Sequence, residues 1–374
     1  MKTRAALLLQ APGEFEVHDV ELDDPRQGEA MIRLVTAGLC HSDDHIATGD
    51  IPVGIYPFCG GHEGSGVVER VGPDTPGWEV GDHVVFSFVP ACGRCKWCAQ
   101  GKQNICNLGA HTLTGARFDD LESFRMSFEG RPVGQMSGIS TFSEHTTVDV
   151  RSLVKVPKHI ALRPLSLLAC GVSTGWGSAV NAAAVGPGDT VIVMGVGGIG
   201  MSAVMGAAHA GAGTIIVVDP VAYKREVAPN FGATDVVATM EEATEIAQAQ
   251  TDGQGADATI VTVGVTTGAH VGQALDSIRK DGIVVVTGAG PAQVSNVPID
   301  LLALAMRQKR ITGSMFGSSS PFTTIPKLTQ MYDRGQLKLD ELITRTYTLE
   351  TLAQGYRDMK AGSIIRGVVD FSDA

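Results

Sequence analysis

Four cysteines lie within fifteen residues of one another, at Cys92, Cys95, Cys98 and Cys106. Four thiolates at this spacing can surround one tetrahedral Zn²⁺, and a complete shell of four sulfur atoms leaves no coordination position for a substrate. We therefore predict a structural zinc in this segment. An iron–sulfur cluster and four unrelated buried thiols are the alternatives.

Three further residues with metal-binding side chains, Cys40, His62 and Cys170, are far apart in the sequence. A catalytic zinc takes sulfur and imidazole ligands and keeps one position open, and two cysteines with one histidine form such a set. Spacing alone does not bring these three residues together, because an isolated buried cysteine or histidine more often packs than binds a metal. Cys59, three residues before His62, is interpreted as a free thiol.

A glycine-rich turn at Gly195, Gly197, Gly198 and Gly200 follows the apolar run TVIVM and opens a helical pattern. Such a turn lets a pyrophosphate approach the amides at a helix N-terminus. Asp219 follows Gly200 by nineteen residues, at the end of the next apolar run, where its carboxylate can accept hydrogen bonds from ribose hydroxyls. A carboxylate there repels a 2′-phosphate, so we predict that the cofactor is NAD and not NADP.

Two different patterns of apolar residues indicate two domains in this chain of 374 residues. Up to about residue 170, short apolar runs broken by glycine and proline favour a mostly β domain. From about Thr190, apolar strands alternate with helical patterns and predict a parallel, doubly wound sheet with six strands by Gly317. Pro229 should kink or shorten one of its helices. The last 50 or so residues are expected to return to the first domain.

Composition excludes several classes of protein. The apolar fraction of 44% with 18% charged residues fits a globular α/β enzyme. The net charge of -11 argues against nucleic acid or an anionic membrane surface as the main partner. We find no secretion signal and no stretch of membrane-spanning length. Crowded cysteines in a chain with an odd total of seven indicate metal binding in a reducing compartment, so a cytoplasmic location is expected.

The motifs GLCHSDDH, GGHEGSGVV, GWEVGDHV, CGRCKWCAQGKQNIC, CGVSTGWGSAV and GVGGIG occur together in one order along the chain. At these residues the sequence resembles the zinc-containing medium-chain alcohol dehydrogenases over essentially its whole length. The resemblance implies a mostly β, GroES-like catalytic domain at 1–171 and 316–374, and a Rossmann NAD-binding domain at 172–315. It also implies two zinc ions per chain and hydride transfer between an alcohol/aldehyde pair and NAD.

The resemblance assigns roles to residues around the second metal site. Cys40, His62 and Cys170 are expected to bind the catalytic zinc, with Glu63 beside it and Asp43 as hydrogen-bond partner of the His62 ring. A zinc with an open position acts as a Lewis acid toward the alcohol oxygen.

A proton path and several cofactor contacts are carried over in the same way. Ser42 and His45 match the positions that pass the alcohol proton outward, although Ser42 could cap a turn and His45 could be a solvated imidazole. The expected cofactor contacts are His41 and Arg366 at the pyrophosphate, Lys224 at the ribose, and Thr174 and Ile199 at the nicotinamide. Lys224 could instead be a solvated charge and Ile199 a core residue, and the spacing around Arg366 differs from relatives by one residue.

More narrowly, SFVPACGRCKWC, VDPVAYKRE and GQLKLDELITRTYTL resemble the nitrosoaniline-dependent branch of the family. Its members hold NAD tightly, are associated with mycofactocin and pass electrons to an external carrier. A homodimer joined at the edges of the cofactor sheets, or a tetramer, is implied. Phe88 and His111 are expected at the substrate entrance.

Three alternatives remain at this point. One is an ordinary alcohol dehydrogenase that exchanges its coenzyme. Another is a formaldehyde dehydrogenase acting on a charged thiol adduct, which would need basic residues at the pocket mouth, and the loop offers Arg117, Arg125 and Arg131. The third is a catalytically silent protein that keeps the fold, against which the intact Cys40, His62 and Cys170 argue.

Overall fold

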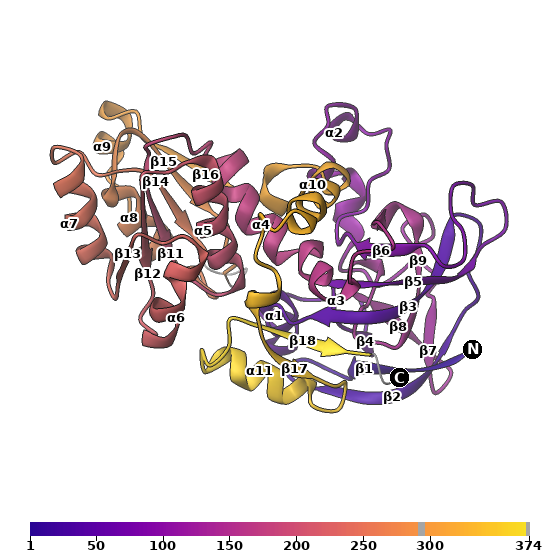
Figure 1. The fold of residues 1–374 in the computed structure, drawn as a ribbon. Helices are drawn as coiled ribbons and strands as arrows, with labels where there is room; N and C mark the ends of the chain where they lie inside the picture. Colours follow the sequence, from indigo (N-terminus) through magenta and orange to yellow (C-terminus); the bar gives the residue numbers. More distant parts are fainter. Residues whose placement is uncertain (291–295, 372–374) are drawn as a thin grey trace. The chain divides into compact units, whose positions relative to one another are not determined.

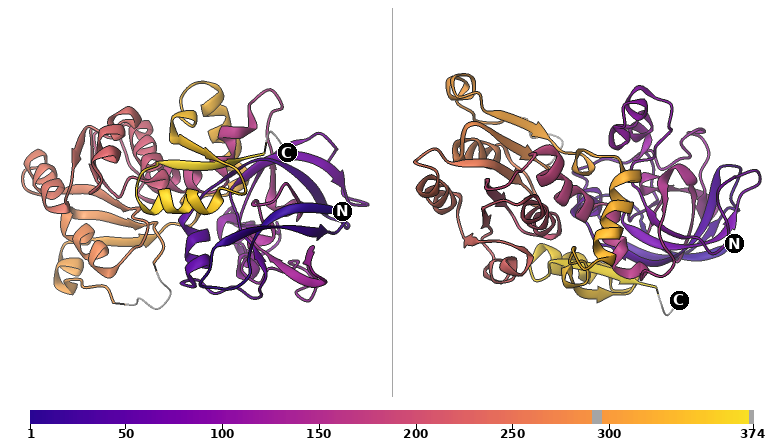
Figure 2. Two further views of the ribbon diagram at one scale, coloured as in Figure 1. Left: turned by 90° about the horizontal axis from the view of Figure 1, so that it is seen from below. Right: turned by 45° about the horizontal axis from the view of Figure 1, so that its top comes forward.

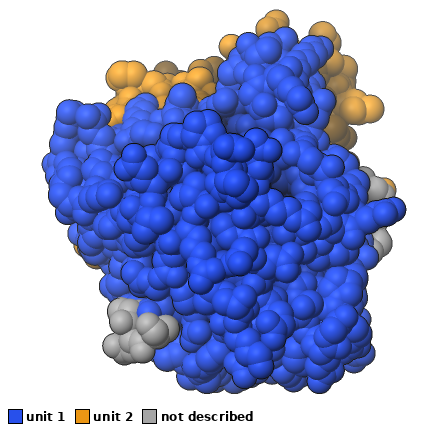
Figure 3. Space-filling view, turned by 90° about the vertical axis from the view of Figure 1, so that its right-hand side faces the viewer, with its two compact units in different colours: residues 1–170, 320–374 blue, residues 171–319 orange. Residues whose placement is uncertain are grey.

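The structure is a computed structural model that describes residues 1–290 and 296–371. Its contacts divide the chain into two compact units, which Figure 3 shows in different colours. Unit 1 comprises Met1–Cys170 and Ser320–Ala374, and unit 2 comprises Gly171–Ser319.

Unit 1 contains a small closed barrel. Its strands, in hydrogen-bonding order, are β1 (Lys2–Leu8), β2 (Phe15–Leu22), β7 (Met126–Phe128), β8 (Arg131–Gln135) and β4 (Phe58–Cys59). Alternate side chains of β1 point to opposite faces of the barrel wall, so Leu7 packs with one buried cluster and Leu8 with another. The barrel gives this unit the mostly β character that its short apolar runs predict.

A seven-stranded sheet completes the β structure of unit 1. Its path is β10 (Leu153–Lys155), β6 (His83–Phe86), β5 (Gly64–Val71), β3 (Glu29–Gly38), β18 (Arg366–Asp370) and β17 (Ile343–Tyr347), and β9 (His145–Asp149) also pairs with β3. Strand β18 is antiparallel to β3, with Val369 opposite Ala37. The ribbon views show this C-terminal segment (yellow) in unit 1 (Figures 1 and 2). Strands β17 and β18 thus pair within the sheet of unit 1.

Short helices flank these strands. They are α1 (His41–Thr48), α2 (Lys96–Ala99), α3 (Leu162–Leu165), α10 (Pro321–Asp333) and α11 (Leu352–Lys360). Helix α1 follows directly on β3 and ends at Gly49, whose φ of 84° is the left-handed conformation that favours glycine at a helix end. Tyr356 of α11 joins the same buried cluster as Leu39 and Ile46. The start of α1 is therefore anchored to the core.

Unit 2 is built on a six-stranded parallel sheet. Its strands, in spatial order, are β13 (Asp235–Val237), β12 (Thr214–Val218), β11 (Thr190–Met194), β14 (Ala256–Val261), β15 (Ile278–Val286) and β16 (Arg310–Gly313). All five pairings are parallel. Strand β11 is buried along its whole length, as expected for a sheet covered on both faces. The predicted Rossmann-type sheet with six strands is confirmed.

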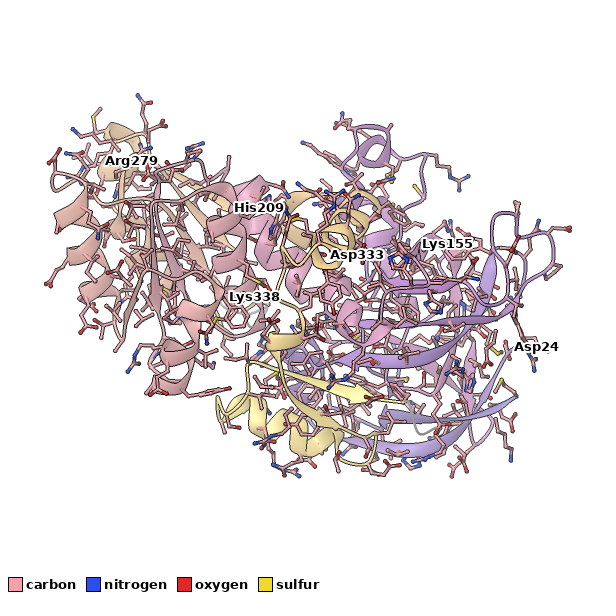
Figure 4. All side chains as sticks on the ribbon, in the orientation of Figure 1. Asp24, Lys155, His209, Arg279, Asp333 and Lys338 are labelled. Atoms are coloured by element: carbon pink, nitrogen blue, oxygen red, sulfur yellow. The ribbon has the colours of Figure 1, made fainter. Side chains whose placement is uncertain are left out.

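Helices cover both faces of this sheet (Figure 1). The helices of unit 2 are α4 (Gly171–Gly177), α5 (Gly198–Ala210), α6 (Ala222–Val227), α7 (Met240–Gln250), α8 (Gly268–Ser277) and α9 (Leu301–Met306). Helix α5 packs on α4, where the ring of His209, labelled in Figure 4, lies 5.5 Å from that of Trp176. Helix α6 stops at Val227 and a 3₁₀ turn, Ala228–Phe231, contains Pro229. The predicted shortening at this proline is confirmed.

None of the helices in the described ranges is both long enough and apolar enough to cross a lipid bilayer.

Candidate zinc and nucleotide sites

Unit 1 brings together the scattered metal-binding residues. Cys40 is the residue before α1, His62 and Glu63 lie between β4 and β5, and Cys170 ends the first segment of the unit. Their four candidate ligand atoms lie within 4.8 Å of one another, and all four residues are buried. Two sulfurs, one imidazole nitrogen and a carboxylate in such a small volume are a donor set that fits Zn²⁺.

The imidazole of His62 is oriented by Asp43. The Asp43 Oδ2 atom lies 3.1 Å from Nδ1 of His62, and its Oδ1 accepts a 2.7 Å hydrogen bond from the amide of Gly61. Gly61 has a φ of 88°, and a Cβ there would lie 2.5 Å from the amide nitrogen of Phe142, so only glycine fits this turn. With Nδ1 facing a carboxylate, Nε2 is the nitrogen left for a metal. Phe88 packs edge-on against the His62 ring at 5.7 Å.

The two thiols of this site differ in acidity. A hydrogen bond from Cys170 and the nearby His62 lower the pKa of Cys40 well below its usual value, although burial raises it. The same hydrogen bond and burial raise the pKa of Cys170. Zinc binds the thiolate form of cysteine, so the pair is arranged to give up a proton when a metal enters.

Glu63 forms a buried ion pair with Arg366 of β18. The Glu63 side chain is fully enclosed and Arg366 is 5% exposed. Burial raises the pKa of Glu63 to about 7, although Arg366 lowers it. A Cβ at Gly38 would lie 2.3 Å from a Glu63 carboxylate oxygen, so the glycine makes room for this pair. The pyrophosphate contact expected of Arg366 remains a prediction.

Helix α1 presents the residues of the predicted proton path. The Ser42 hydroxyl oxygen lies 3.7 Å from the Cys40 sulfur. His45, one turn later, is 3% exposed and its Nδ1 lies 3.0 Å from Oδ2 of Asp50. His45 is therefore not a solvated imidazole. Asp50 was not predicted from the sequence as the partner of His45. The one sequence feature that points to it is its position directly after Gly49, the glycine that ends the helix.

The four crowded cysteines form the second candidate zinc site, in a lobe around α2. Their sulfur atoms lie within 4.8 Å of one another. The Cys92 sulfur accepts a hydrogen bond from the Cys95 amide at 3.3 Å, and Cys95 in turn accepts one from the Cys98 amide at 3.5 Å. Amide donors from Asn107 and Cys98 lower the pKa of Cys95 to about 6. Such donors stabilise thiolates, which fits a closed four-sulfur zinc shell.

Unit 2 carries the predicted dinucleotide turn. Gly195 follows β11 with a φ of 88°, and a Cβ at Gly200 would lie only 2.0 Å from the carbonyl oxygen of Gly195. The glycines thus permit the tight turn that opens α5. The N-terminal amides of α5 can then face an anion.

Asp219 is held beside this turn. Its Oδ2 accepts a 2.9 Å hydrogen bond from the Val196 amide and its Oδ1 accepts one of the same length from Val221. The Lys224 ammonium lies 3.9 Å from Oδ2. Arg225, which sequence reasoning missed, donates to the Asp219 carbonyl oxygen at 2.6 Å. Both carboxylate oxygens keep lone pairs for ribose hydroxyls.

The remaining predicted cofactor residues have distinct surroundings. The Thr174 hydroxyl on α4 is buried, and no hydrogen-bond partner for it is found among the described residues. Ile199, in the first turn of α5, is half-buried, as is His41 at the start of α1 in unit 1.

The arginines of the loop that follows the zinc lobe form ion pairs with carboxylates of unit 1. Arg117 and Arg125 are 4% and 1% exposed and donate to the same oxygen of Glu29, at 3.0 and 2.7 Å. Arg131 is exposed and pairs with Glu129 in its own turn. Arg117 and Arg125 thus neutralise an internal carboxylate and do not face solvent.

Comparison with known proteins identifies the class. A profile described as "Alcohol dehydrogenase GroES-like domain" matches residues 26–158, and one described as "Zinc-binding dehydrogenase" matches residues 198–334. The chain belongs to the zinc-containing medium-chain alcohol dehydrogenase family, and it is an oxidoreductase that acts on CH–OH groups. Binding of a nicotinamide dinucleotide is typical of this family.

Individual relatives extend over the full length. A Mycobacterium tuberculosis protein provisionally named alcohol dehydrogenase D is 46% identical over 370 residues, which cover 99% of this chain and 100% of the relative. The NDMA-dependent alcohol dehydrogenase of Amycolatopsis methanolica is 45% identical, with 99% of each chain covered. The crystal structure of benzyl alcohol dehydrogenase from Acinetobacter calcoaceticus superimposes with a TM-score of 0.91 at 28% identity, covering 100% of both chains.

Proposed function

We propose that this enzyme oxidises a primary alcohol with a tightly held NAD that is then reoxidised by an external acceptor, as in the nitrosoaniline-dependent branch. The observation that carries the proposal is the buried set Cys40, His62, Glu63 and Cys170, whose ligand atoms lie within 4.8 Å. Sequence identity of 45% over 99% of the chain to an NDMA-dependent relative supports the branch. In this proposal residues 1–171 and 316–374 hold the metals, and 172–315 hold the NAD.

Each zinc has its own set of residues. Cys92, Cys95, Cys98 and Cys106 would hold the structural ion. Cys40, His62 and Cys170 would hold the catalytic ion, with Glu63 beside it. Zinc bound there supplies a Lewis acid that lowers the pKa of an alcohol.

The protein's own groups then move the proton and fix the cofactor. Ser42 and His45 are three residues apart on α1 and so lie on one face of the helix. His45 can pass a proton from Ser42 toward Asp50, which is half-buried, and so toward water. NAD supplies the hydride acceptor. Its expected contacts are His41, Thr174, Gly195, Gly197, Gly198, Ile199, Gly200, Asp219, Lys224 and Arg366.

The pairing of Arg117 and Arg125 with Glu29 argues against a thiol-adduct formaldehyde dehydrogenase. A charged adduct would need cationic side chains at the mouth of the pocket. Arg117 and Arg125 instead pair with Glu29 inside unit 1. We therefore infer a small, uncharged primary alcohol, aliphatic or aromatic, as substrate.

The test of the branch is the metal and nucleotide content of purified, dialysed protein, by elemental analysis and acid release of nucleotide. We expect about two zinc ions, one for each ligand set, and about one NAD per chain. Turnover with a nitrosoaniline acceptor and no added NAD should follow. Two zinc ions with no NAD, and activity only on adding NAD, would instead mean an ordinary coenzyme-exchanging enzyme.

We also propose a cytoplasmic homodimer joined at the edges of the cofactor sheets, with mycofactocin as the physiological acceptor. Strand β16 ends the described sheet order, and β15 is its one partner there. Leu301, Leu302 and Met306 of neighbouring α9 are 70%, 70% and 72% exposed. Such an apolar patch beside an open strand edge favours self-association.

Sedimentation velocity of Leu302→Lys tests this assembly, with Leu121→Lys, at an exposed leucine of unit 1, as the matched control. Wild type and Leu121→Lys should sediment as dimers and Leu302→Lys as a monomer. A wild-type monomer contradicts the dimer, and a wild-type tetramer calls for a second interface.

A further inference from the structure

Ser178 is a fully buried hydroxyl where three elements of unit 2 meet. It begins the π-helical turn Ser178–Ala182, which continues α4. Its Oγ lies 2.7 Å from the carbonyl oxygen of Thr174, 3.0 Å from the Thr287 hydroxyl and 2.9 Å from the Ser314 hydroxyl. A hydroxyl has one hydrogen and two acceptor lone pairs, and a carbonyl can only accept. Ser178 can therefore accept from Thr287, and its single hydrogen is shared between the Thr174 carbonyl and the Ser314 hydroxyl, to both of which it is placed to donate.

The partners of Ser178 lie at the carboxyl ends of two strands. Thr287 directly follows β15, and Ser314 directly follows β16, where its amide still donates to Val286. Ser178 therefore ties α4 to the ends of both strands.

The chain just beyond Ser314 is held against the same helical segment. Phe316, Gly317 and Ser318 form a turn with φ values of 51°, 64° and 54°, a left-handed conformation that is costly for residues other than glycine. A Cβ on Gly177 would lie 2.5 Å from the carbonyl oxygen of Gly317, so the two main chains touch. This turn depends on its contact with the helix.

The sheet order indicates which part of a dinucleotide these strand ends face. The glycine turn follows β11 and Asp219 follows β12, so the adenosine half belongs over β12 and β13. The other half must extend over β14, β15 and β16, because a dinucleotide spans the carboxyl edge across the point where strand order reverses. The buried Thr174 hydroxyl, with no hydrogen-bond partner in the described residues, lies one helical turn before Ser178.

We propose that Ser178 is a positioning residue for the nicotinamide half of the cofactor. It touches no reacting atom. It fixes the main chain of Thr174 and the ends of β15 and β16 as one rigid wall for the nicotinamide ring. The inference rests on the proposed use of NAD by this unit.

The test compares two nucleotides that share the adenosine half. NADH carries the nicotinamide and ADP-ribose lacks it, and the affinity of full-length Ser178→Ala for each is measured by fluorescence titration and by calorimetry. We expect NADH to bind about tenfold more weakly, the size of effect that loss of one or two hydrogen bonds gives. ADP-ribose affinity should be unchanged. If NADH is retained through dialysis, its dissociation rate replaces the titration.

Ser277→Ala is the matched control. Ser277 is also fully buried and contacts a helix carbonyl, that of Ala274, and a strand hydroxyl, that of Thr259, but Thr259 lies within β14 and not at its end. It should alter neither affinity. Should Ser178→Ala fail to fold, Thr287→Val removes the hydroxyl partner at the end of β15 with little change in volume and should weaken NADH alone.

Three results are distinguishable. Selective weakening of NADH supports the inference. Equal weakening of both nucleotides, or of neither, overturns it and leaves the proposed function standing. A wild-type protein that binds neither nucleotide overturns the proposed function, and the inference with it.

Discussion

His62 and Asp43 form a buried pair in which Nδ1 of the ring lies 3.1 Å from a carboxylate oxygen. Neither side chain is more than 3% exposed. The second Asp43 oxygen is held by the amide of Gly61, the residue before His62. The carboxylate therefore fixes both the tautomer and the direction of the ring that faces Cys40 and Cys170.

Asp43→Asn should weaken zinc binding at this site. Loss of the carboxylate that orients a metal-binding histidine typically lowers metal affinity or activity by about 10- to 100-fold. Competition with a chromogenic chelator measures the affinity. Asp44→Asn, at the neighbouring carboxylate that pairs with Lys360 at 2.7 Å, is the control and should bind zinc as wild type does. If both variants bind zinc with equal affinity, Asp43 does not contribute to the metal site.

Cys98→Ser should release the lobe zinc and leave the catalytic one, because the two ligand sets share no residue. The expected readouts are one zinc per chain fewer by elemental analysis and a lower melting temperature. Cys59→Ala is the control and should keep both zinc ions. Cys59 is buried outside both sets, and burial raises the pKa of its thiol to about 12. Unchanged zinc content in Cys98→Ser would refute the four-sulfur site.

Asp219→Gly should reduce the preference for NAD over NADP. The variant loses the acceptor for the ribose hydroxyls and the charge that repels a 2′-phosphate. A hydrogen bond to a charged group contributes about 1.5–3 kcal/mol, so the ratio of the two affinities should fall by about tenfold or more. Asp235→Asn on β13 should leave the ratio unchanged. If Asp219→Gly keeps the wild-type ratio, Asp219 does not contact the ribose.

Glu29→Gln should destabilise unit 1 by about 3–5 kcal/mol, since it removes the carboxylate that pairs with buried Arg125 and leaves buried Arg117 with Asp23 alone, at 3.2 Å. Chemical denaturation followed by circular dichroism measures this. Glu129→Gln, at the exposed pair with Arg131, should change stability by less than about 1 kcal/mol. Similar losses in the two variants would show that the buried pair adds nothing.

The same variant tests the pH dependence. Burial raises the pKa of Glu29, but Arg125, the Arg26 amide and Arg117 together bring it below its usual value. A lowered folded-state pKa gives stability that is present above the unfolded pKa of about 4.3 and is lost as the pH falls through the folded value. The difference between wild type and Glu29→Gln should therefore shrink below about pH 4. A difference that stays constant down to pH 3 contradicts this assignment.

Features that depend on short spacings can be predicted from the amino-acid sequence alone. Cys92, Cys95, Cys98 and Cys106 are close in the chain, so any compact loop brings their sulfurs together. The glycine turn after β11 and the end of α6 before Pro229 are likewise local, since φ and the loss of an amide donor act within a few residues. Alternating apolar strands and helices were enough to predict the parallel sheet of unit 2.

Pairs between distant side chains, in contrast, are seen only in the three-dimensional fold. Arg366 lies 303 residues from Glu63, and Arg125 lies 96 residues from Glu29. Nothing in the local sequence distinguishes these arginines from exposed ones such as Arg131. Strand pairing and burial make the difference, because an arginine enclosed by a sheet or barrel must find a carboxylate, whereas an exposed one is satisfied by water.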